Sequence, residues 1–175
     1  ADQSAHGYKL KSIAKTFVFP LGFYSTQIKN IHQLSAGATV AIANDPTNEG
    51  RALLLLADHG LIKVDRTKGE LITVHDITSN PKHLHFETLA AATLPRVLKD
   101  AKLVAINNDF IKFIGLNPKY ALLTESGSVP YANILVVRKQ QKLNPKLREL
   151  IAVLHSKAFI KATRKQFPGA VLAWT

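Results

Sequence analysis

The sequence of 175 residues contains no cysteine. Disulfides, thiolate metal sites and a thiol nucleophile are therefore excluded, while the cellular compartment stays open. Long hydrophobic runs are also missing, because the longest, at residues 52–57, is far shorter than the roughly 20 residues of a membrane-spanning helix. The first residues, ADQSAHGYKLKS, show no apolar stretch with a small-residue cleavage site, so we expect any export signal to have been removed. The ordinary proportions of hydrophobic and charged residues predict a compact globular fold.

Sequence motifs of catalysis are absent as well. There is no Gly-rich phosphate loop, nucleophile elbow, dinucleotide fingerprint or pair of carboxylates in an acid–base motif. Among the seven histidines, only His83 and His85 are close enough in sequence to suggest a metal site, and two ligands do not complete a zinc site. The sequence therefore predicts a binding protein and not an enzyme, without metal or cofactor.

Acidic residues are scarce, with 12 Asp and Glu against 23 Lys and Arg, which gives a formal net charge of +11. The region Arg138 to Lys165 holds nine basic residues and a single Glu. Four of them recur at helical spacing and would form a basic stripe on a C-terminal helix: Lys157, Lys161, Arg164 and Lys165. We interpret this stripe as a solvated helix face; the alternative is a module that binds nucleic acid or another polyanion. No nucleic-acid partner is expected, because no recognised motif supports that alternative.

A near-repeat is the most informative pattern in the chain. Residues 40–45 (VAIAND) and 104–109 (VAINND) both have the pattern of a buried strand that ends in Asn and Asp. Helical patterns follow at residues 49–58 and 109–114, which predicts strand-to-helix units of an α/β fold with a parallel sheet. Ligands of such sheets bind beyond the carboxyl ends of the strands, so the repeat indicates a site at that edge.

Other elements are predicted from local patterns. Strands are expected at residues 15–19, 84–89 and 133–137, and amphipathic helices at residues 143–154 and 156–167.

The segment NDPTNEGR, from Asn44 to Arg51, carries a well-specified helix start. Asp45 is a natural N-cap, and Pro46 fits the first helical position. The N–H groups at this helix start and the guanidinium of Arg51 would suit an anion such as a carboxylate. A capped helix with a surface arginine is the alternative interpretation.

Two asparagines, Asn107 and Asn133, are placed at predicted strand ends. A side-chain amide can both donate and accept hydrogen bonds, which suits the ammonium and carboxylate groups of a zwitterion. Ordinary turn chemistry is the alternative for both residues.

Several runs of the chain match one family in register. They are KTFVFPLGFYS (Lys15 to Ser25), ATVAIANDPTNEGRALLLL (Ala38 to Leu56), VAIN (Val104 to Asn107) and PYANILVVR (Pro130 to Arg138). With these runs the chain resembles the NlpA-type methionine-binding lipoproteins, the substrate-capturing subunits of methionine ABC importers. The resemblance implies a two-lobed fold like that of type II periplasmic binding proteins, with parallel or mixed sheets flanked by helices.

Under this resemblance, residues 20–131 form lobe two, and residues 1–19 with 132–175 form the remaining part of lobe one. Family members begin with a further strand-helix region that this chain lacks, so the first lobe is expected to be incomplete. The implied function is capture of L- or D-methionine, or a close analogue, in a cleft between the lobes for delivery to a membrane permease. The implied location is the periplasm or cell envelope, with a lipid anchor on the full-length precursor. A fragment without ligand binding, and self-association through the incomplete lobe, are the alternatives.

The resemblance also implies roles for individual residues. Arg51 would bind the ligand carboxylate, and Asn107 and Asn133 its amino and carboxylate groups. Tyr24 is a further pocket-lining candidate, for which core or hinge packing is the alternative. The stretch Asn108 to Phe110 departs from the family, which tends to have small or hydroxyl residues and Tyr there.

Overall fold

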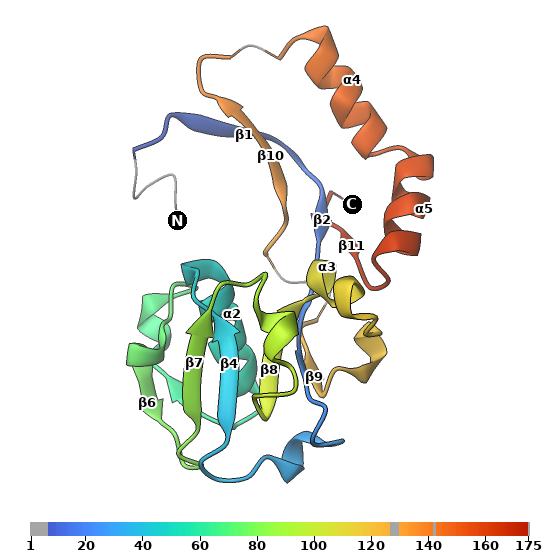
Figure 1. The fold of residues 1–175 in the computed structure, drawn as a ribbon. Helices are drawn as coiled ribbons and strands as arrows, with labels where there is room; N and C mark the ends of the chain where they lie inside the picture. Colours follow the sequence, from blue (N-terminus) through green and yellow to red (C-terminus); the bar gives the residue numbers. More distant parts are fainter. Residues whose placement is uncertain (1–6, 127–129, 142, 175) are drawn as a thin grey trace. The chain divides into compact units, whose positions relative to one another are not determined.

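The computed structural model describes residues 7–126, 130–141 and 143–174; Lys142 of the basic region lies outside them. The chain divides into two compact units, one formed by Leu21–Glu125 and the other by Ala1–Pro20 with Ser126–Thr175. The backbone therefore passes between the units at Pro20–Leu21 and at Glu125–Ser126 (Figure 1). The assignment of these parts to two lobes of a binding protein stays a prediction.

The unit Leu21–Glu125 is built on a five-stranded sheet with the order β7-β4-β8-β3-β9 (Figure 1). Its strands are β3 (Leu21–Tyr24), β4 (Thr39–Ala43), β7 (His85–Leu89), β8 (Leu103–Asn107) and β9 (Leu123–Thr124). Strand β4 runs parallel to β7 and β8, whereas β3 runs antiparallel to β8 and β9. The two strands of the near-repeat are thus confirmed as parallel neighbours, in a sheet that is mixed.

The two faces of this sheet bury separate apolar clusters, because successive side chains of a strand point to opposite faces. On one face, Val40 and Ile42 pack with Leu53 and Leu56 of helix α2 (Pro46–Asp58). The other face buries alternate residues of the same strands together with 3-10 helix η4 (Leu94–Val97). Burial of a single leucine side chain contributes roughly 1.5–3 kcal/mol to the free energy of folding. The apolar clusters on both faces therefore fix the position of β4 and β8, including the strand ends.

Short elements complete this unit. Strands β5 (Lys63–Val64) and β6 (Ile77–Ser79) pair with each other, and the short helix α3 (Asn108–Ile111) follows β8 directly. The remaining 3-10 helices are η1 (Ile31–Gln33), η2 (Arg66–Lys68), η3 (Val74–Asp76), η5 (Lys112–Ile114) and η6 (Pro118–Tyr120).

The other unit pairs the two ends of the chain. Strand β1 (Leu10–Lys15) is antiparallel to β10 (Ile134–Arg138), and β2 (Phe17–Val18) is antiparallel to β11 (Val171–Leu172). Helices α4 (Pro145–Leu154) and α5 (Lys157–Gln166) confirm the two predicted C-terminal helices (Figure 1).

Aromatic side chains pack against one another in this unit. The ring of Phe17 lies 5.2 Å from that of Trp174 and 6.2 Å from that of Phe159, measured between centroids. His155 stacks on Trp174 at 4.1 Å. The four basic side chains of α5 face solvent, as expected of a solvated helix face: Lys157, Lys161, Arg164 and Lys165. Among the described residues, no helix combines the length and the apolar character needed to cross a membrane.

Candidate ligand-binding site

The start of α2 fixes the first polar side chain of the site. Asp45 is the N-cap, and its carboxylate accepts hydrogen bonds from the backbone N–H and the side-chain amide of Asn48, at 3.0 and 2.9 Å. Pro46 occupies the first turn, as predicted. Asn48 uses only its backbone N–H and its Nδ2 in these two hydrogen bonds to Asp45, so its Oδ1 is held in place and can accept from other donors.

Asn48 connects two of the residues predicted to bind a ligand. Its Oδ1 accepts a hydrogen bond from Nη1 of Arg51 at 2.9 Å and another from Nδ2 of Asn107 at 2.9 Å. Arg51 lies on the first turns of α2, and Asn107 is the last residue of β8. The structure therefore brings Arg51 and Asn107 together at the carboxyl edge of the parallel strands, where the near-repeat predicted a site.

Arg51 is buried, with only 6% of its surface exposed, and it faces a carboxylate of its own chain. Its Nε and Nη2 donate to Oε1 and Oε2 of Glu125 at 2.9 and 2.6 Å, which is a bidentate ion pair. Glu125 is held in turn, because Oε2 accepts from the backbone N–H of Leu21 at 2.8 Å. The interpretation of Arg51 as a surface arginine is therefore wrong. Sequence reasoning did not identify Glu125, since no local motif surrounds it.

Unsatisfied acceptors accompany this ion pair. Within the described part of the chain, the buried Oδ1 atoms of Asn107 and Asp109 have no hydrogen-bond partner. Burial raises the pKa of the Asp109 carboxyl, and the nearby positive charge of Arg51 opposes that shift. A buried acceptor without a donor costs about 1–3 kcal/mol, so a ligand that brings an N–H group would be stabilised here.

Asn133 lies in the other unit, immediately before β10. Its side-chain amide donates to the carbonyl of Phe17 at 3.3 Å, and its own backbone carbonyl accepts from Thr16. The residue is exposed. Its predicted role in ligand binding stays a prediction.

Tyr24 is a core residue in this structure. It packs in the apolar cluster that includes Leu94, and burial raises its pKa to about 12. In the register of β3 with β8, Tyr24 pairs with Val104, whereas Leu21 at the other end of β3 pairs with Asn107. Tyr24 therefore lies at the end of β3 away from Asn107, and its predicted role in lining a pocket stays a prediction.

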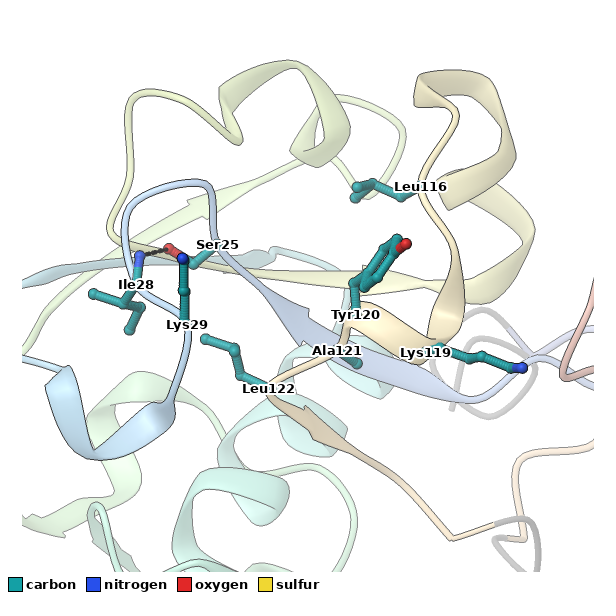
Figure 2. A pocket seen from close by; sticks show the side chains of 8 residues that line it. All are labelled: Ser25, Ile28, Lys29, Leu116, Lys119, Tyr120, Ala121 and Leu122. Atoms are coloured by element: carbon teal, nitrogen blue, oxygen red, sulfur yellow. Dashed lines mark hydrogen bonds between the residues drawn. The ribbon is translucent and has the colours of Figure 1, made fainter.

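A separate hollow of about 510 Å³ lies beside the end of β3 that carries Tyr24 (Figure 2). Ile28, Leu116 and Leu122 give it apolar walls, and Lys29 and Lys119 lie at its border. It contains none of the four predicted site residues. In the described residues, no group of three or more histidine or acidic side chains is arranged to hold a metal ion.

Comparison with solved structures defines the class of protein. A periplasmic substrate-binding protein of an ABC transporter from Coxiella burnetii matches with a TM-score of 0.92 and 45% identity, over 98% of this chain and 73% of that one. A nutrient-binding protein from Burkholderia cenocepacia, bound to methionine, matches with a TM-score of 0.92 and 38% identity, over 99% and 74%. The fold is that of periplasmic substrate-binding proteins, as the sequence predicted.

The family follows from the sequence comparison. The model of the NlpA lipoprotein family matches residues 1–174, and the chain belongs to this family. The D-methionine-binding lipoprotein MetQ of Salmonella typhimurium is 42% identical over 172 residues, which are 96% of this chain and 64% of that protein. The chain spans 64–65% of the length of such curated relatives.

Proposed function

We propose that this chain is the ligand-recognising part of an amino-acid-binding protein that serves an ABC importer, with methionine or a close analogue as its ligand. The observation that carries the proposal is the hydrogen-bonded group formed by Arg51, Asn48 and Asn107 at the carboxyl edge of the sheet. The methionine-bound structure from Burkholderia cenocepacia and the name of the MetQ relative support the choice of ligand.

In this proposal, the two ends of the amino acid meet different side chains. The ligand carboxylate binds the guanidinium of Arg51 through charge-assisted hydrogen bonds. The ligand ammonium donates to Oδ1 of Asn107, which has no donor within the described part of the chain. Asn133 is proposed as a further ligand contact on the family resemblance.

The proposed partner is the membrane permease of an ABC importer, and the proposed location is the periplasm or another part of the cell envelope. The ABC-transporter binding protein of Coxiella burnetii supports the partner, and the lipoprotein names of the relatives support attachment of the precursor by a lipid anchor.

Isothermal titration calorimetry with L-methionine and with D-methionine tests the proposal. Saturable binding of one ligand per chain is expected for at least one enantiomer. Arg51→Ala should weaken that binding by tens-fold or more, because deleting one partner of a buried charge pair typically costs about 2–5 kcal/mol. Arg66→Ala is the matched control, since the Arg66 side chain belongs to the same unit and is 57% exposed. Equal affinities of the wild type and Arg51→Ala would contradict the proposal.

A further inference from the structure

Glu125 is an unexpected neighbour for Arg51, because it places a carboxylate of the chain itself against the guanidinium that is proposed to bind a ligand carboxylate. Its carboxylate takes the Nε and Nη2 edge of Arg51, and its side chain is only 6% exposed. Both ends of Glu125 are fixed on Leu21, which donates to Oε2 and accepts from the Glu125 backbone N–H at 3.0 Å. The carboxylate is therefore a built part of the site and not a surface group that happens to reach Arg51.

The charges around Arg51 do not favour a simple anion. One guanidinium carries a single positive charge, and Glu125 already compensates it. Asp109 brings a second carboxylate, whose buried Oδ1 has no hydrogen-bond partner among the described residues. Like charges that are held close together repel each other, and the repulsion is stronger where little water screens it. A ligand carboxylate is therefore accepted more readily when the same molecule carries an ammonium group.

Building on the proposed function, we propose that Glu125, together with Asp109, is a specificity-determining residue. By compensating the charge of Arg51, the two carboxylates restrict the site to zwitterionic amino acids and reject carboxylates that lack the ammonium group. Asn107 adds to this selection, because its buried Oδ1 has no hydrogen-bond partner among the described residues and the ammonium group of an amino acid brings a donor that the bare carboxylate lacks.

The test compares two ligands that differ only in the amino group, L-methionine and 4-(methylthio)butanoate. Their dissociation constants are measured by calorimetry for the wild type, for Glu125→Gln and for Glu87→Gln. Glu87 is an exposed residue of β7 in the same unit, so its variant makes the same change of net charge away from the site. In Glu125→Gln, the preference for methionine should fall at least tenfold, mainly through tighter binding of the butanoate. In Glu87→Gln, the preference should stay at the wild-type value.

The outcomes separate this inference from the proposed function. If the wild type binds no methionine, the proposed function fails and the inference fails with it. If the wild type binds methionine and the ligand preference of Glu125→Gln is unchanged within twofold, only the inference is overturned. If Glu125 had only a structural role, Glu125→Gln would weaken the binding of both ligands equally and leave the ratio of their dissociation constants unchanged.

A second variant covers the case in which Glu125→Gln does not fold, as shown by circular dichroism. Asp109→Asn keeps the shape of the side chain and the Arg51–Glu125 ion pair while it removes one carboxylate charge. It should shift the ligand preference in the same direction by a smaller factor of about three. An unchanged preference in Asp109→Asn would then overturn the inference.

Discussion

Replacing Glu125 by Ala should destabilise the unit Leu21–Glu125 by about 3–5 kcal/mol, the usual cost of removing one partner from a buried ion pair. The magnitude follows from the geometry, because both side chains are only 6% exposed and two hydrogen bonds, of 2.9 and 2.6 Å, join them. The backbone N–H of Leu21 also loses its carboxylate acceptor. Arg51→Ala should cost a similar amount, since it leaves the Glu125 carboxylate buried beside Leu21.

A double-mutant cycle isolates the interaction between the two charges. The double variant Arg51→Ala/Glu125→Ala should lose less than the sum of the single variants, with a coupling of about 1–3 kcal/mol. Amide hydrogen exchange of the buried strand β8 is a suitable assay, because it reports on this unit. Fluorescence is not, because the single tryptophan, Trp174, lies in the other unit. A loss of unfolding free energy below about 1 kcal/mol in each single variant would refute a strongly coupled buried pair, and so would a loss in the double variant equal to the sum of the single losses.

Two further predictions concern neighbours of this ion pair. Gly50→Ala should destabilise the same unit by more than the about 1–3 kcal/mol that ordinary overpacking costs, because the new Cβ would clash with the backbone oxygen of Glu70. Thr47→Ala is the control, since Thr47 is an exposed residue of α2. Equal melting temperatures of the two variants would contradict the predicted clash. Asp109→Asn should raise stability at pH 7, because burial raises the pKa of the folded Asp109 above 3.8 and the wild type therefore loses stability as the pH rises between the two pKa values. The advantage of the variant should shrink as the pH falls from the folded pKa towards 3.8 and be absent below 3.8. Melting curves at pH 7 and at pH 3.5 check the Asp109 prediction, and a constant difference between the variants would refute it.

The elements that sequence reasoning predicted correctly are those with a local physical signal. Strands β4 and β8 were recognisable as short apolar runs with turn residues after them, and α2 by its Asp45 cap and Pro46. Strand β3 gave no such signal, because it is short, follows Pro20 directly and contains Gly22. Its place between β8 and β9 makes the sheet mixed, and this pairing depends on contacts distant in sequence.

In the candidate site, too, the residues with a local sequence signal were predictable and those that depend on tertiary contacts were not. Arg51 and Asn107 were predicted, and the structure places them around Asn48, which belongs to the NDPTNEGR segment but had no predicted role. Glu125 could not be predicted, because it lies 74 residues from Arg51 in sequence and meets it only through the position of β9 at the sheet edge. The ion pair is thus a product of tertiary structure.

A crystal structure of the protein with bound methionine tests the central claim most directly. The predicted result is a ligand carboxylate within about 3 Å of the Arg51 guanidinium and a ligand ammonium within about 3 Å of Oδ1 of Asn107. Methionine bound in the hollow beside Lys29 and Lys119, or bound elsewhere without contact to Arg51, would contradict it.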